Sequence, residues 1–276
     1  MKRTIYILIV LTIPILGFGQ GYQTLEEKTS SFKAKKKVKV MNINGPITVV
    51  GSDRSDIKLS YELKAKPEYD GGLENAKEDL SFTVKEYNDS LVVYLDGPFI
   101  RWREGRRHIN HNSEDYDYRF NCVISLEVPT NIDLDVSTIN QGNVKVSNIS
   151  GKVIAENVNS GVELTNIRGT VVANAINGDI DVDFDGNPGS GSFFETVNGD
   201  IKTKVPTNLS ASVAFKSMIG EFYTDLNYTS EKTGIVKKND RNTTYKIEQL
   251  TQVKFGNGEA DMYFETLNGN MYLRSN

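Results

Sequence analysis

The chain has 276 residues, with 32 Lys and Arg against 36 Asp and Glu, which gives a formal net charge of −4. This mild acidity argues against a nucleic-acid-binding protein, which needs a basic face. The single cysteine, Cys122, rules out an internal disulfide. It lies in FNCVISLEV, on the apolar face of an alternating strand, so we expect a small buried hydrophobic side chain.

Residues 1–19 have the pattern of a secretory signal peptide. Lys2 and Arg3 precede an apolar stretch over Ile5–Leu16, and small residues at Gly17–Gly19 favour cleavage. The apolar stretch is too short to span a bilayer. We therefore expect an exported mature chain, in the periplasm, at the cell surface or outside the cell, with no transmembrane segment. Loss of the two basic residues changes its net charge from −4 to about −6.

Several elements are predicted ahead of the main repeat. Lys58–Ala65 alternates like a strand, and Gly72–Leu80 is the one segment with helical character. Ser81–Tyr87 and Leu91–Leu95 are predicted to form a hairpin, and Arg119–Val128 is predicted to be another strand.

A short phrase then organises the chain: an apolar residue, Asn, Gly and an alternating strand. It occurs at least seven times, counting a degenerate copy without Asn at Met218-Ile219-Gly220, and from Ile139 to Met218 its copies are 19, 18, 21 and 21 residues apart. Asn-Gly favours positive φ, so each copy predicts a sharp turn. The predicted turn residues are Asn44, Gly45, Asn140, Gly142, Asn159, Gly161, Asn177, Gly178, Asn198, Gly199, Gly220, Asn268 and Gly269.

A second strand lies between successive copies, at Lys152–Val158, Thr170–Ile176 and Ser192–Val197. Similarity at every second strand is what a coil requires, because each strand then stacks on its counterpart one turn later. We therefore predict an all-β fold, a right-handed parallel β-helix or β-solenoid with about 20 residues per coil, inserted hairpins and one short helix. The alternative is an antiparallel β-sandwich.

Stacking of the coils predicts columns of side chains. One aliphatic column is Val144, Val162, Ile180, Ile201 and Phe222, and the next is Val146, Leu164, Val182, Thr203 and Thr224. Outside, Lys145 should pair with Glu163 and Asp181 with Lys202, and the Asn amides should bond from coil to coil.

We expect residues 20–276 to form a single domain, because no Pro/Ser-rich linker divides them. Two polar insertions are predicted, at about 97–119 and 231–246. The chain ends on a strand at Met271–Arg274, which leaves an open solenoid edge unless a loop covers it.

These residues resemble a known family. The matching text is VPTNIDLDVSTINQGNVKV (128–146), NVNSGVEL (157–164), AINGDIDV (175–182), TVNGDIKTKVPTNLSASV (196–213) and FETLNGNMYL (264–273). It is similar to the bacterial "putative adhesin" domain family, a group of unknown function related to the auto-transporter adhesin head domain. The resemblance implies an exported β-helical protein with no catalytic residues to carry over.

The acidic run Asp179, Asp181, Asp183 and Asp185 has three interpretations. The first is a pair of catalytic carboxylates, because carboxylates two residues apart on a strand lie about 6.6 Å apart, a spacing that inverting glycosidases use. A calcium site is the second interpretation, although the Gly-rich nonapeptide of calcium-binding β-rolls is missing. The third, which we favour, is a solvated acidic face.

The insertion at 97–119 holds Arg101, Trp102, Arg103, Arg106 and Arg107, which suit an anionic or sugar partner. An acidic second half at 114–117 provides an alternative, a self-neutralising hairpin. This insertion also contains His108 and His111, the only histidines, which we interpret as surface residues and not metal ligands.

The sequence therefore predicts an exported, non-enzymatic, adhesin-like solenoid without a required cofactor. Its expected partner is an envelope polysaccharide, a lipid head group or a protein. The alternatives are a polysaccharide-active enzyme that uses Asp179–Asp185 and an envelope-sensing module.

Overall fold

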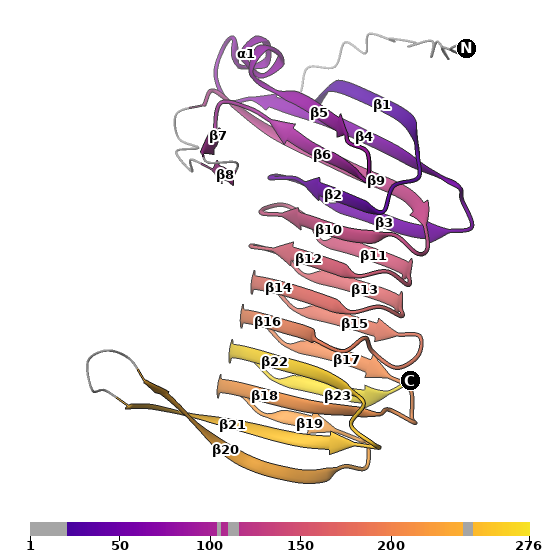
Figure 1. Cartoon of the computed structure of the whole chain (residues 1–276). Helices are drawn as coiled ribbons and strands as arrows, with labels where there is room; N and C mark the ends of the chain where they lie inside the picture. Colours follow the sequence, from indigo (N-terminus) through magenta and orange to yellow (C-terminus); the bar gives the residue numbers. More distant parts are fainter. Residues whose placement is uncertain (1–20, 104–105, 110–115, 240–244) are drawn as a thin grey trace.

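The computed structural model describes residues 21–103, 106–109, 116–239 and 245–276, with side chains outside 101–115 and 230–250. Figure 1 shows a tall stack of coils, with the N-terminal elements at one end and a long hairpin at the other. The predicted signal peptide at 1–19 lies outside the described residues. Among the described residues, no helix is long and apolar enough to cross a membrane.

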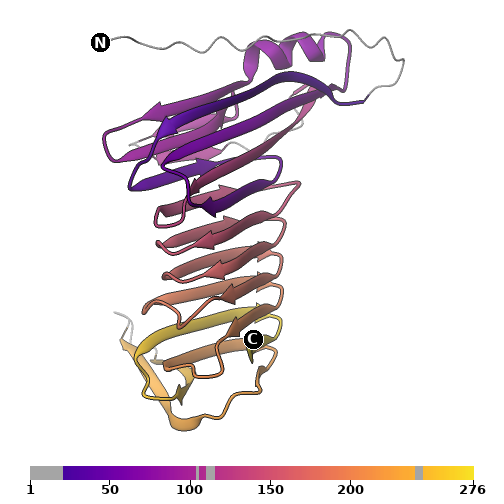
Figure 2. The same ribbon diagram turned by 90° about the vertical axis from the view of Figure 1, so that its right-hand side faces the viewer.

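Two large sheets face each other across the core, as the view in Figure 2 shows. Sheet A, in spatial order, consists of β1 (Gln23–Lys33), β4 (Asp56–Pro67), β9 (Tyr118–Pro129), β3 (Ile47–Ser52), β11 (Val144–Ile149), β13 (Val162–Ile167), β15 (Ile180–Phe184), β17 (Ile201–Val205), β23 (Met271–Ser275) and β19 (Phe222–Thr224).

Sheet B, in spatial order, consists of β20 (Thr229–Asn239), β21 (Tyr245–Phe255), β18 (Ala211–Ile219), β22 (Ala260–Asn268), β16 (Ser192–Asn198), β14 (Val171–Asn177), β12 (Val153–Asn157), β10 (Asp133–Thr138), β2 (Lys37–Met41), β6 (Ser90–Asp96) and β5 (Ser81–Glu86). A small separate sheet pairs β7 (Ile100–Arg103) with β8 (Arg106–Ile109), and α1 spans Gly72–Asp79.

Each coil is one sheet B strand, a corner and one sheet A strand. Strands of neighbouring coils pair in parallel, so that Val144 lies beside Val162, Val162 beside Ile180 and Ile180 beside Ile201. The predicted parallel solenoid of about 20 residues per coil is confirmed, and the antiparallel sandwich is wrong. The inward aliphatic side chains form one continuous core from Val38 to Leu273.

The C-terminal end differs from the prediction in its spatial order. Ile201 pairs with Met271, and Met271 in turn pairs with Phe222, so the last coil of the chain lies between two earlier ones. Figure 1 shows this coil, β22 and β23, inside the stack. The predicted contact of Ile201 with Phe222 is therefore wrong, as is an open edge at Met271–Arg274.

The long hairpin explains this insertion. After β19 the chain runs out along β20 and returns along β21, which pairs antiparallel with β18. The return carries the chain past the β18–β19 coil, and β22 then enters between β16 and β18. Phe264 of β22 is completely buried and stacks on Phe194, with ring centroids 4.8 Å apart.

The N-terminal end is built in the same way. The coil of β2 and β3 lies between β6 and β9 on one side and β10 and β11 on the other. The chain leaves this coil through β4 and α1 and then forms the predicted β5–β6 hairpin. β6 and β9 make up an outer coil, after which the chain returns to the stack at β10. At this end β1 forms the edge of sheet A and β5 forms the edge of sheet B.

Asparagines line one corner of the solenoid. Between each pair of neighbouring coils, the amide of one Asn donates to the side-chain oxygen of the other, at 2.6–3.1 Å. The predicted amide ladder is thus present, and its members in spatial order are Asn44, Asn140, Asn159, Asn177, Asn198 and Asn268.

A glycine comes after the asparagine at these corners because the backbones of stacked corners approach each other closely. A Cβ on Gly178 would lie 2.2 Å from the carbonyl oxygen of Ser160, and one on Gly199 would lie 2.2 Å from that of Gly178. Of the predicted turn glycines, Gly45, Gly220 and Gly269 have positive φ. At Gly142, Gly178 and Gly199 close approach, and not a left-handed backbone, requires glycine.

Candidate binding surface

The outer face of sheet A is polar and largely self-paired. The predicted bond between Lys145 and Glu163 is present, with Nζ to carboxylate at 2.7 Å, and it lowers the pKa of Glu163. Asp181 and Lys202 lie side by side in the sheet, as predicted. The ammonium of Lys202, however, binds Asp179 at 2.7 Å, so the predicted Asp181–Lys202 ion pair is wrong.

The acidic run does not form one group of carboxylates. Asp181 and Asp183 lie on β15, while Asp179 and Asp185 lie beyond its two ends, so the expected single strand face is wrong. Asp185 binds the guanidinium of Arg168 at 2.6 Å. Among the described residues, no three or more His, Cys, Asp or Glu side chains are arranged to hold a metal ion.

Asp179 and Asp181 have opposite electrostatic environments. Partial burial alone would raise the pKa of Asp179, but the hydrogen bonds from Lys202 and from the backbone N–H of Asp200 lower it. Burial raises the pKa of Asp181, against the attraction of Lys202, with smaller contributions from the neighbouring carboxylates. A general acid needs a raised pKa, but it also needs a shaped, water-poor site around it.

The arginine-rich insertion replaces a corner of the outer N-terminal coil. It joins β6 of sheet B to β9 of sheet A, and its backbone forms the β7–β8 hairpin, in which Arg101 pairs with His108 and Trp102 with Arg107. The side chains of Arg101, Trp102, Arg103, Arg106 and Arg107 lie outside the described part, as does His111. The predicted ligand site there stays a prediction.

Cys122 is completely buried on β9, as expected. Burial raises the pKa of its thiol to about 12, with a smaller contribution from the charge of Glu26. Its environment therefore suppresses the thiolate, the form that reacts.

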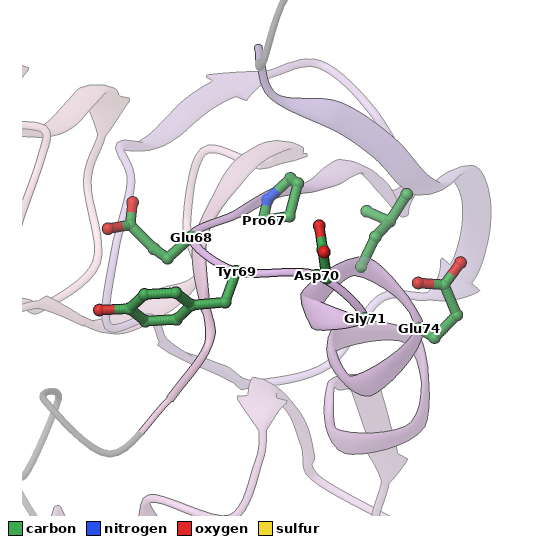
Figure 3. Close-up of a pocket in the computed structure, with 7 residues that line it drawn as sticks. Pro67, Glu68, Tyr69, Asp70, Gly71 and Glu74 are labelled. Atoms are coloured by element: carbon green, nitrogen blue, oxygen red, sulfur yellow. The ribbon is translucent and has the colours of Figure 1, made fainter.

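Two shallow depressions lie at opposite ends of the molecule. Figure 3 shows the one between β4 and α1, where Glu68, Tyr69 and Glu74 point in different directions around a space of about 450 Å³. Glu68 is bound to Arg119 at 2.8 Å, and Tyr69 is 74% exposed. These side chains do not converge on a common point, so the depression lacks the geometry of a compact ligand site.

The outer face of sheet B differs from that of sheet A, because two columns of apolar side chains run along it. The first lies in the middle of the strands and consists of Ile154, Val172, Phe193 and Tyr263. The second precedes the asparagine ladder and consists of Val158, Ile176, Val197, Leu267 and Met218.

These columns reach solvent. Ile176, Leu267 and Met218 expose 45%, 41% and 76% of their surface, and the other members are half-buried. Phe193 and Tyr263 stack with ring centroids 5.1 Å apart. A contiguous exposed apolar strip of this kind, repeated over several coils, is typical of an interaction surface.

A polar column separates the two apolar ones. Its members in spatial order are Glu156, Asn174, Glu195, Glu265 and Lys216. Lys216 binds Glu265 at 2.9 Å, but within the described residues no ion pair reaches Glu156 or Glu195. The buried Oδ1 of Asn174 also has no hydrogen-bond donor there. The polar column is therefore acidic and has few hydrogen-bond donors.

The sequence contains a signal for this face that the turn-based prediction did not use. Val153-Ile154-Ala155 and Val171-Val172-Ala173 place apolar residues at consecutive positions, as does Phe193-Phe194. A strand with one wet face alternates, whereas consecutive apolar residues cover both faces. These strands therefore differ in kind from the alternating strand Ile180–Phe184, in which only the inner face is apolar.

Comparison with known proteins relates the central coils to a family. Residues 128–251 match the family model described as Toastrack DUF4097. This part of the chain is similar to the Toastrack family. The resemblance found in the sequence is thereby confirmed. The Toastrack match begins at the end of β9, so the N-terminal coil of β2 and β3 and the C-terminal coil of β22 and β23 lie outside it.

Comparison with solved structures finds bacterial proteins of low similarity to this chain. A "putative cell adhesion protein" of Clostridium sporogenes is 10% identical, with a TM-score of 0.42 over 92% of this chain and 100% of its own. A "putative adhesin" of Bacteroides fragilis is 10% identical, with a TM-score of 0.35 over 90% and 97%. A "putative lipid binding protein" of Parabacteroides distasonis is 12% identical, with a TM-score of 0.30 over 91% and 96%. No curated protein sequence matches the chain.

Proposed function

We propose that this protein is an exported, non-enzymatic, adhesin-like module that binds a component of the cell envelope through the outer face of sheet B. The observation that carries the proposal is the pair of exposed apolar columns on that face, including Ile176 and Leu267. Solenoids commonly bind along such a stacked surface and not in a pocket. The adhesin resemblance and the signal-peptide pattern of residues 1–19 support the exported location.

Retention on isolated envelope fragments of the producing cells tests the proposal. The variant Ile176→Thr/Leu267→Thr removes exposed apolar area without entering the core, so we expect it to elute early while wild-type protein is retained. The variant Trp102→Ala/Arg103→Ala, in the arginine-rich insertion, is the comparison. The proposed surface would be contradicted if the sheet B variant were retained as strongly as the wild-type protein. It would also be contradicted if only the insertion variant lost retention.

Protease treatment of intact cells tests the location. An adhesin at the cell surface is digested before the envelope is broken, whereas a periplasmic protein is digested only afterwards. Recovery of the chain in the cytoplasmic fraction, with residues 1–19 still attached, would overturn export.

A further inference from the structure

The polar column between the two apolar columns of sheet B indicates the chemistry of the partner, an inference that rests on the proposed function. We infer that the face is shaped for a cationic amphipathic helix of a partner protein, lying along the solenoid axis. Its basic stripe would face Glu156 and Glu195, and its apolar flanks would cover the columns on either side.

The dimensions fit a helix. The two apolar columns are four residues apart along each strand, as at Val172 and Ile176, which corresponds to about 13 Å. An α-helix with its side chains is about 10–12 Å across, so it fits between them. Coils repeat about every 4.8 Å and helix turns about every 5.4 Å, so side chains from three to four turns can meet five successive coils.

The charges select a basic partner. Glu156 and Glu195 are exposed carboxylates two coils apart, with Asn174 between them. Three lysines of this sheet are already bound: Lys37 and Lys39 to Asp135, at 3.0 and 3.1 Å, and Lys216 to Glu265. A face with acceptors in the middle and apolar side chains at both edges is complemented by Lys or Arg between apolar flanks.

The same charges disfavour a second copy of this chain. A two-fold axis parallel to the strands at the middle of the column places Glu195 opposite its own copy in the partner, and an axis along the column places each side chain opposite its own copy. Like charges that face each other in an interface are costly.

Binding of a synthetic 18-residue helical peptide, with one Lys stripe between two Leu flanks, tests the inference. We expect fluorescence anisotropy to show binding that weakens with salt, because exposed charges are screened. Glu156→Gln/Glu195→Gln should weaken it about tenfold or more and flatten the salt dependence. Asp181→Asn/Asp183→Asn removes the same charge from sheet A and should leave binding unchanged.

Other results would overturn the inference. One such result is that a peptide with Glu in place of Lys binds as tightly as the Lys-stripe helix, and another is that an extended alternating Lys-Val peptide binds more tightly than that helix. A third is that the sheet A variant loses as much affinity as the sheet B variant. Sedimentation that shows a dimer broken by Ile176→Thr/Leu267→Thr would assign the face to self-association. If those two substitutions abolish envelope retention while the Lys-stripe helix does not bind, the proposed function stands and the helical partner is wrong.

Discussion

The aspartate that follows Asn-Gly in two central copies of the repeat has a structural role. Oδ1 of Asp179 accepts the backbone N–H of Asp200 at 2.9 Å, and Oδ1 of Asp200 accepts that of Asn270 at 2.8 Å. Asn270 in turn accepts the backbone N–H of Glu221 at 3.0 Å. Asn270 accepts the same kind of hydrogen bond as Asp179 and Asp200 do. The hydrogen-bond acceptor is therefore what matters at this position, and not the negative charge.

Neutralising Asp179 or Asp181 should have opposite effects on stability. Asp179→Asn keeps the acceptor but loses the ion pair with Lys202, and because that pair is nearly half exposed, we expect a loss of less than about 1 kcal/mol at pH 7. Asp181→Asn should be neutral or stabilising, because burial raises the pKa of Asp181 and thus disfavours its charged form. Urea unfolding at pH 7, 5 and 3 measures both.

The effect of each of these two substitutions on stability should depend on pH. The lowered pKa of Asp179 contributes stability above the unfolded value of about 3.9, and this is lost as the pH falls through the folded pKa. The Asp179→Asn difference should therefore shrink at pH 3. The Asp181→Asn difference should shrink too, because wild-type Asp181 is then protonated. A larger loss for Asp181→Asn than for Asp179→Asn at pH 7 would contradict this assignment.

Two corner glycines should differ in their tolerance of a methyl group. Gly178→Ala places Cβ 2.2 Å from the carbonyl oxygen of Ser160, so the stacked backbones must separate, at a cost of about 3 kcal/mol. At Gly161 the nearest atom is 3.1 Å away, and Gly161→Ala should cost much less. Thermal unfolding of the two variants compares them directly, and equal melting temperatures would refute close approach as the reason for glycine.

At the scale of whole elements, the last coil of the chain holds two others together. β22 pairs with both β16 and β18, and β23 pairs with both β17 and β19. Its inner side chains Phe264, Met271 and Leu273 are almost completely buried. The lower half of the solenoid therefore depends on a segment that follows the long β20–β21 hairpin in the sequence.

Truncation after Glu259 should remove this support. We expect the backbone amides of β16 and β17 to lose protection against hydrogen exchange, while β10 to β13 keep theirs, because solenoid coils are stabilised by their immediate neighbours. Deletion of residues 21–33 is the control, since β1 pairs only with β4 at the other end. Full protection of β16 and β17 in the truncated chain would show that β18 and β19 can close the gap.

The sequence allowed the coil to be predicted but not the order of the coils. Spacings of 18–21 residues fix which residues stack, so the asparagine ladder and the Lys145–Glu163 pair followed from the repeat alone. Every coil offers aliphatic residues in the same register, however, and nothing local distinguishes Met271 from Phe222 as the neighbour of Ile201. That choice depends on the path of the β20–β21 hairpin, which is a property of the whole chain.

The candidate surface was harder to predict, for a different reason. The strands after Asn-Gly form sheet A, and their charged residues are the ones in which the sequence pattern indicates a catalytic or metal site. The apolar columns lie on the strands before Asn-Gly, where Ile154, Val172 and Phe193 lie next to inward apolar residues. Consecutive apolar residues show that both faces are apolar, but not that one of them remains exposed.

At the scale of the molecule, the two sheets have different outer faces. Sheet A presents charges that largely bind one another, such as Lys145 with Glu163 and Asp179 with Lys202. Sheet B presents two apolar columns and an acidic one between them. The arginine-rich β7–β8 hairpin and the far end of the β20–β21 hairpin extend on one side in Figure 1, at the two ends of the stack.

Protection of single cysteines from alkylation tests the central claim, that binding occurs on sheet B. Cys122 is completely buried and its thiol pKa is raised, so the wild-type protein should not react with the alkylating reagent. The variant Val172→Cys then reports on the outer face of sheet B, and Thr165→Cys reports on that of sheet A. With the protein bound to envelope fragments, we predict slow alkylation at position 172 and an unchanged rate at position 165. Protection at position 165 alone, or at neither position while the protein remains bound, would contradict the account.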